Sequence, residues 1–226
     1  MELREALTTT GAVREFSPEP VDTATVRRLL DTARFAPSGG NRQAWRAVLI
    51  QDADTKRRLR DLYLTGWYEY LSMGAAGLVP WAPLTDRAAE AEAISHAGEM
   101  RPAANAGGFA EHLDQAPVLI VLLANLRSLA AVDRDHDRYT LVGGASIYPF
   151  AWSILLAARD EGLGGVMTTM LCREEDAVLE LLDVPEGWAL AAGIVLGHPA
   201  GRRPTRLRRA AVDDFATVDR FDGPSL

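Results

Sequence analysis

The chain has 226 residues, of which 48% are hydrophobic, and its formal net charge is -7. This length and apolar fraction suit one domain with a well-buried core, and no proline- or serine-rich linker divides residues 1–226. The acidic balance argues against general nucleic-acid binding, because contact with phosphates needs a basic face.

Cysteine usage and apolar stretches point to a cytoplasmic protein. The single cysteine, Cys172, can form no internal disulfide, which suits a reducing compartment. The first residues lack the charged-then-apolar layout of a signal peptide. The uncharged stretch 141–158 approaches the length of a membrane span. It contains Pro149 and several glycines and has no second such stretch beside it, so a buried or subunit-contact helix is the better interpretation.

The N-terminal part of the chain alternates apolar residues at helical spacing with proline and glycine breaks. Pro18 and Pro20 exclude helix in the stretch before Asp22. Asp22 and Asp54 are typical N-caps, and we expect each to begin a helix. The pattern predicts helices at 2–9 and 22–35, a strand at 45–50, and a helix from 54.

Residues 64–113 show no clean period and contain several aromatic residues. We expect this segment to be an insertion or lid over the core. Beyond it, the continuous apolar run 117–123 is typical of a strand buried on both faces. The predicted elements that follow are a helix at 141–158, a strand at 165–169, a helix at 174–182 and a strand at 188–196.

The order of these elements predicts the fold class. Helices and strands are mixed without strict alternation, which favours α+β over a doubly wound parallel sheet. Residues 200–226 have no period and are expected to form an extended C-terminal arm.

Several kinds of catalytic machinery are missing from the sequence. The four histidines are scattered, with no pair or Cys/His cluster at metal-ligand spacing, so we expect no metal site. There is no nucleophile elbow, no phosphate loop and no dinucleotide fingerprint. If the chain is an enzyme, a bound organic cofactor is expected to perform the difficult step.

The segment 36–43, Ala-Pro-Ser-Gly-Gly-Asn-Arg-Gln, is the most informative motif. Its glycines can adopt positive φ and admit a flat ligand close to the backbone. Ser38, Asn41 and Gln43 offer directional hydrogen bonds in the same place. Taken alone, the segment is more simply interpreted as the turn that ends a helix.

Two further segments are candidates for ligand binding. Five arginines lie within eight residues of the C-terminal arm: Arg202, Arg203, Arg206, Arg208 and Arg209. Such guanidinium groups suit bidentate phosphate contacts, although a solvated basic tail is an equally good interpretation. The glycine-rich segment 162–169 precedes a strand and could turn backbone amides toward a ligand, or be an ordinary buried strand end.

Taken in order, these pieces resemble the FMN-dependent nitroreductase family over nearly the whole chain. The resemblance rests on Val13-Arg14-Glu15-Phe16, the segment 36–43 with Trp45, Gly162-Leu163-Gly164, and Gly197-His198-Pro199 with the arginine tail. It implies one nitroreductase-like domain, with a central, mostly antiparallel sheet flanked by helices. It also implies an intertwined homodimer with two FMN molecules at the subunit interface.

The resemblance assigns roles to particular residues. Arg14, Arg206 and Arg208 would hold the flavin phosphate, and Arg209 could replace Arg208. Residues of the partner's turn would lie near the ribityl chain and ring: Pro37, Ser38, Gly39 and Asn41. The stretch Met167-Thr168-Thr169 would place a backbone amide near flavin N5. No side chain would be catalytic, because N5 carries the chemistry.

One departure from the family pattern concerns the phosphate end. Family members usually carry Arg-x-Ser before the position of Arg14, whereas this chain has Thr10-Gly11-Ala12. Two phosphate or ribityl contacts are lost, so either the tail arginines take a larger share or FMN binds more weakly.

The resemblance also implies an activity. NAD(P)H would reduce the flavin and leave, and an electron-poor small molecule (a nitroaromatic, a quinone or similar) would then be reduced in the same space. Trp67, Tyr68, Trp81 and Phe109 are candidates to stack on this acceptor, although core packing explains each equally well. Two alternatives remain: a dehydrogenase or dehalogenase of a specialised pathway on the same fold, and a non-catalytic flavin-binding protein.

Overall fold

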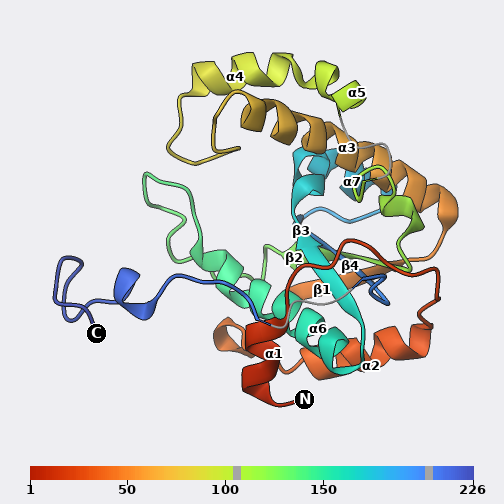
Figure 1. The fold of residues 1–226 in the computed structure, drawn as a ribbon, viewed down its shortest axis with the longest axis horizontal. Helices are drawn as coiled ribbons and strands as arrows, with labels where there is room; N and C mark the ends of the chain where they lie inside the picture. The colour runs from red at the N-terminus through yellow and green to blue at the C-terminus, as the bar shows by residue number, and fades with distance from the viewer. Residues whose placement is uncertain (104–107, 202–205) are drawn as a thin grey trace.

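A four-stranded antiparallel sheet forms the centre of the protein. The computed structural model describes residues 1–103, 108–201 and 206–226. The strands lie in the order β1-β2-β4-β3, with bounds Trp45–Ile50 (β1), Val118–Asn125 (β2), Gly164–Thr168 (β3) and Trp188–Gly197 (β4). Helices cover both of its faces (Figure 1), which confirms the predicted α+β class.

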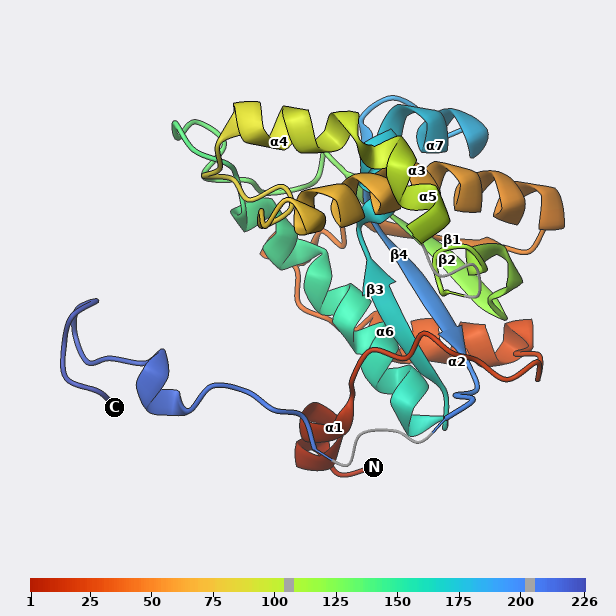
Figure 2. The same cartoon turned by 45° about the horizontal axis from the view of Figure 1, so that its top comes forward.

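Strand β2 shows how the two faces acquire their helices. Its side chains alternate between two apolar clusters, as the pleat of a strand requires. Val118, Ile120 and Leu122 pack in one cluster with α2 (Thr23–Ala33) and α6 (Tyr148–Asp160). Leu119, Val121 and Leu123 pack in the other with α3 (Ala53–Ala75) and α7 (Glu175–Leu181). The two helical layers are visible above and below the sheet in Figure 2.

The N-terminal helices form largely where the sequence predicts them. Helix α1 spans Leu3–Thr9, and Asp22 caps α2 by accepting a hydrogen bond from the Thr25 amide at 2.6 Å. The predicted cap of the next helix, Asp54, is wrong. Asp52 accepts from the Thr55 amide at 2.7 Å, and Asp54 lies inside the first turn, paired with Arg57.

The segment predicted as a lid is mostly helical. Helix α3 continues to Ala75, followed by α4 (Arg87–Ser95) and the single turn α5 (Met100–Ala103). The Ser72 hydroxyl on α3 donates to the carbonyl of Ala93 on α4, so the two helices are joined within a buried contact. That residues 64–113 close over a ligand stays a prediction.

Two predicted helices begin later than expected. The stretch from 141 opens with a 3-10 turn, Val142–Ser146, because Gly143 and Gly144 favour a turn and Pro149 suits the first turn of α6. Helix α7 likewise follows a 3-10 turn, Met170–Glu174. Among the described residues, no helix is both long and apolar enough to cross a bilayer.

Residues 206–226 form an arm that leaves the body of the protein (Figures 1 and 2). The Leu207 amide donates to the carbonyl of Thr8 at 2.8 Å, which ties the start of the arm to α1. A short 3-10 turn, Val212–Asp214, interrupts it. Arg202 and Arg203 lie outside the described residues.

Candidate functional site

A cavity of about 530 Å³ lies between α3, β3 and residues 108–111. Arg14, Met167 and Thr168 line it, so the fold brings together three of the predicted site residues. The rest of the wall is largely apolar and aromatic, with contributions from Tyr63, Trp67, Tyr70, Leu71, Phe109, Ala110, Val166 and Met170. This combination of apolar walls and a few polar groups is typical of a small-molecule site.

Glycines at the start of β3 determine where Arg14 lies. The Val13 amide donates to the Gly165 carbonyl at 2.9 Å, which lays the chain before Arg14 alongside β3. A Cβ on Gly165 would be 2.4 Å from the carbonyl oxygen of Val195, and one on Gly164 would be 2.6 Å from Val13 Cγ2. These glycines therefore permit close packing of backbone and side chains at this edge.

The Arg14 side chain is free to meet a ligand. It is exposed, and within the described ranges its guanidinium makes no hydrogen bond or ion pair. It also borders a second, more open cavity of about 630 Å³ that includes Glu15, Ser17 and His112. Arg14 therefore lines two neighbouring cavities.

Two cavity residues escaped the sequence analysis. The hydroxyl groups of Tyr63 and Thr168 lie 3.1 Å apart, and burial raises the pKa of Tyr63 against the opposing effects of that hydrogen bond and of Arg14. Glu111 has one buried carboxylate oxygen without a hydrogen-bond partner. Tyr63 continues the apolar spacing of its helix and so resembled a core residue, whereas nothing in the sequence distinguishes Glu111.

The predicted turn at 37–41 is exposed and strained. Ser38 Oγ accepts from the Gln43 amide, and the Gly39 amide donates to Ser146 Oγ, both at 3.0 Å. Asn41 and Gln43 have positive φ values of 52° and 49°, which cost energy for residues other than glycine. Such strain, held in place by side-chain hydrogen bonds, is common at ligand sites.

Within one chain, this turn is separate from the cavity of about 530 Å³ beside β3, which we call the Arg14 cavity. Pro37 borders a different hollow, of about 410 Å³, between α2 and α6. Arg14 lines two cavities, and neither includes a residue of the turn among its described lining residues. Thr169 is exposed just after β3 and does not line the Arg14 cavity, although its carbonyl accepts from the Cys172 amide.

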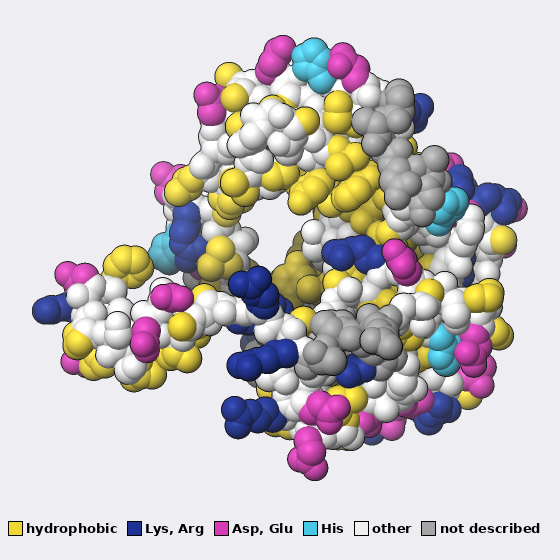
Figure 3. All heavy atoms as spheres, viewed as in Figure 1, with side chains coloured by type: hydrophobic (Ala, Val, Ile, Leu, Met, Phe, Trp, Pro, Cys, Tyr) yellow, Lys and Arg dark blue, Asp and Glu magenta, His cyan; other side chains and the backbone are white. Residues whose placement is uncertain are grey.

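The arm arginines lie near the chain that leads to Arg14. Arg206 and Arg208 are exposed on either side of Leu207, whose amide bonds to Thr8. Figure 3 shows basic side chains gathered where the arm leaves the body. Over the described part of the chain, no group of three or more His, Cys, Asp or Glu residues could hold a metal ion.

Comparison with known proteins identifies the family. The model of the nitroreductase family matches residues 8–198. The chain belongs to this family. The predicted resemblance is therefore confirmed, and with it the expectation of an oxidoreductase.

Several curated relatives are similar over most of their length. NADH dehydrogenase of Thermus thermophilus is 30% identical over 84% of this chain and 82% of that protein. FMN reductase [NAD(P)H] of Bacillus subtilis is 24% identical over 96% and 74%. The 5,6-dimethylbenzimidazole synthase of Rhodospirillum rubrum is 30% identical over 85% and 79%.

Solved structures share the fold. A BluB-like flavoprotein from Clostridium difficile superposes with a TM-score of 0.69, covering 97% of this chain and 100% of that one at 18% identity. At this identity the likeness concerns the fold alone.

Proposed function

We propose that the protein is an FMN-dependent NAD(P)H oxidoreductase that reduces an electron-poor small molecule. The observation that carries this proposal is the cavity of about 530 Å³, which is lined by Arg14, by the end of β3 and by aromatic side chains. Within the described residues, the Arg14 guanidinium has no hydrogen-bond or ion-pair partner there. The names of the relatives support the choice of flavin and of nicotinamide donor.

The residues present fit a bound flavin. The cavity volume lies within the range of small-molecule sites, and its apolar wall suits an isoalloxazine ring. FMN supplies a ring nitrogen, N5, that takes up and returns hydride. The chain's own contribution is to orient the ring along Met167 and Thr168, and to hold the flavin phosphate with the positive charge of Arg14.

A homodimer accounts for the separation of the two half-sites. In this proposal, the turn bearing Pro37, Ser38, Gly39 and Asn41 comes from the partner subunit and completes the cavity of Arg14. Large apolar side chains are exposed on α1, on the α2–α6 side and along the arm, which favours burial against a second copy. They include Leu3, Phe35, Tyr148, Trp152, Phe215 and Phe221.

The aromatic wall suggests the class of acceptor. Trp67 and Phe109 line the cavity and favour a flat, electron-poor ring such as a nitroaromatic or a quinone. Of the other predicted stacking residues, Tyr68 lies under Arg101 and Trp81 under Arg173, and neither lines the cavity. Residues 64–113 would roof the site as a lid within a single domain, 1–226.

A different reaction on the same flavin is the second candidate. The 30% identity to 5,6-dimethylbenzimidazole synthase favours it, because that relative is as similar as the NADH dehydrogenase. A dehydrogenase or dehalogenase of a specialised pathway would use the same half-sites with a different acceptor.

The visible absorbance of the purified protein tests the proposal. We expect a yellow protein, or one that stays yellow after FMN addition and desalting, and bleaching on anaerobic addition of NADH or NADPH. Protein that remains colourless after FMN addition would contradict a flavoenzyme. Yellow protein that neither nucleotide bleaches would favour the second candidate or a non-catalytic flavin protein.

A further inference from the structure

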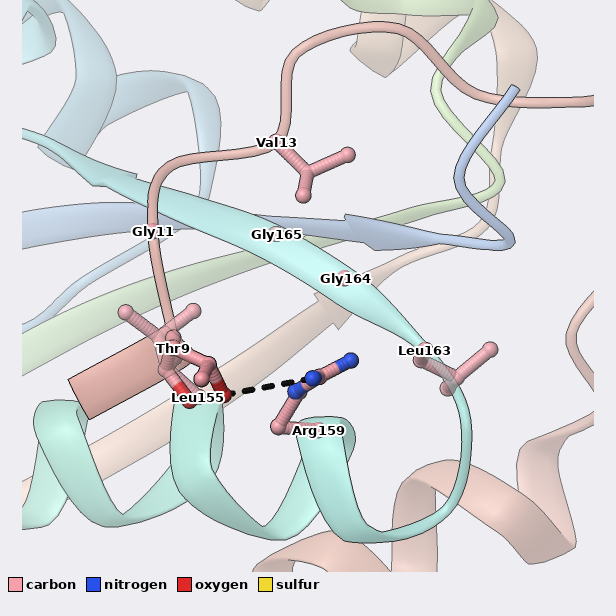
Figure 4. A pocket seen from close by; sticks show the side chains of 9 residues that line it. Thr9, Gly11, Val13, Leu155, Arg159, Leu163, Gly164 and Gly165 are labelled. Carbon is pink, nitrogen blue, oxygen red and sulfur yellow. Dashed lines mark hydrogen bonds between the residues drawn. The ribbon is translucent and has the colours of Figure 1, made fainter. Parts of the chain in front are cut away.

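A small pocket lies beneath the turn that leads to Arg14 (Figure 4). It is formed by the end of α1, the last turn of α6 and the start of β3, and its volume is about 10 Å³. Such a volume admits one oxygen atom of a ligand or one water molecule, but not a whole anion.

Arg159 enters this pocket from α6. Its Nη2 donates to Thr9 Oγ1 at 3.2 Å, as the dashed line in Figure 4 marks. Among the described residues, its Nε is buried without a hydrogen-bond partner, and so is the Oγ1 atom of Thr10, which also lines the pocket. Two unpaired polar atoms of complementary chemistry therefore belong to residues that line a space large enough for one further oxygen.

The positive charge of Arg159 also lacks a counter-ion in the described part of the chain. The acidic residues that follow it are engaged elsewhere: Asp160 pairs with the N-terminal amine, and Glu161 pairs with Arg28. A partly buried cation without a carboxylate is costly, and an anionic ligand would offset that cost.

The arm brings further positive charge to the same turn. The Leu207 amide bonds to the carbonyl of Thr8, next to the threonine that Arg159 contacts. Arg206 and Arg208, on either side of Leu207, are exposed at this place.

We propose that Arg159 is the buried cation of a phosphate subsite on the turn Thr8–Gly11, with Arg206 and Arg208 on its outer side. One phosphate oxygen would occupy the small pocket between Arg159 Nε and Thr10 Oγ1. The ligand is a phosphate monoester, here the phosphate end of the proposed FMN, so the inference rests on the proposed function. Arg159 would then supply, from below the turn, a positive charge. The segment Thr10-Gly11-Ala12 lacks this charge because it has no arginine.

Comparison of FMN with riboflavin, which has no phosphate, tests this subsite. Both are titrated into the apoprotein by quenching of flavin fluorescence, for wild type, Arg159→Met and Arg159→Lys. We expect Arg159→Met to weaken FMN binding at least tenfold and to leave riboflavin binding unchanged, while Arg159→Lys retains most FMN affinity. Arg27→Met, which removes an exposed arginine of α2 that makes no ion pair within the described residues, is the matched control and should change neither affinity.

Other outcomes would overturn the subsite. Equal weakening of FMN and riboflavin would show that Arg159 only supports the fold, and no change in either would show that the pocket holds water alone. Inorganic phosphate provides a readout independent of flavin, because a ligand of the native state raises its Tm. Phosphate that stabilises wild-type apoprotein but not Arg159→Met would support the subsite even if no flavin bound, an outcome that contradicts only the proposed function.

Discussion

The hydroxyl groups of Tyr63 and Thr168 lie 3.1 Å apart and join the middle of α3 to the end of β3 at the cavity wall. Tyr63→Phe keeps the buried ring and removes this hydrogen bond. We expect the free energy of unfolding to fall by about 1 kcal/mol, the usual effect of one lost hydrogen bond. Urea denaturation measures it. Tyr70→Phe, a half-exposed cavity residue, is the control, and an equal loss there would contradict the assignment.

Replacing two different glycines by alanine should change the stability of the protein in opposite directions. A Cβ on Gly165 would meet the Val195 carbonyl oxygen at 2.4 Å, so Gly165→Ala should destabilise the protein by about 3 kcal/mol or more, as overpacking does. Gly74 lies in α3 with nothing within 4 Å of an added Cβ. Gly74→Ala should therefore stabilise by up to about 1 kcal/mol through helix propensity. Thermal denaturation of both variants decides, and equal Tm values would refute the packing argument.

Ser146 is predicted to hold the turn that completes the partner's flavin site in the proposed dimer. Ser146→Ala leaves the Gly39 amide without its acceptor, which should cost about 1 to 2 kcal/mol and lower flavin retention. Flavin content after desalting and denaturant unfolding measure the two effects. Ser153→Ala, on the next turns of α6, is the control and should behave as wild type. Normal flavin retention in Ser146→Ala would contradict a role of this hydrogen bond in cofactor binding.

Cys172 is predicted to be unreactive and to weaken the fold at high pH. Burial, aided by Glu175, raises the pKa of its thiol to about 11. Alkylation by iodoacetamide at pH 8 should therefore be much slower than for a free thiol. Above pH ~9 the unfolded chain loses this proton and the folded chain keeps it, so stability declines toward pH 11. The decline should be shallower in Cys172→Ala, and identical pH profiles would contradict the shift.

The sequence predicted the sheet better than the site. Strand β1 forms at the predicted residues 45–50, because an apolar run stands between turn residues on both sides. The start of α3 was misplaced because Asp52 and Asp54 both suit an N-cap, and only the three-dimensional path of the backbone decides which carboxylate reaches the free amide. The helices of 64–113 were missed because α4 packs on α3, to which the Ser72–Ala93 hydrogen bond joins it, and so carries no apolar stripe aimed at the sheet.

Within the site, motif residues could be predicted and supporting residues could not. Arg14, Met167 and Thr168 belong to contiguous motifs, and the fold brings them to one cavity. Tyr63 contacts Thr168 from α3, and Arg159 contacts Thr9, on the turn before Arg14, from α6. Their roles depend on the packing of distant segments, which no local pattern records.

The shared flavin site can be tested directly by complementation between two defective copies. Arg14→Ala/Arg206→Ala removes the cationic half-site, and Ser38→Ala/Asn41→Gly removes the polar turn while keeping a residue suited to the positive φ at 41. Each variant alone should retain little FMN. Co-expressed with different tags and purified as the mixed dimer, they form one site with both halves intact, so the mixed dimer should hold about one FMN per two chains. A mixed dimer as empty as its parents, or a monomer that retains FMN, would contradict a site built from two subunits.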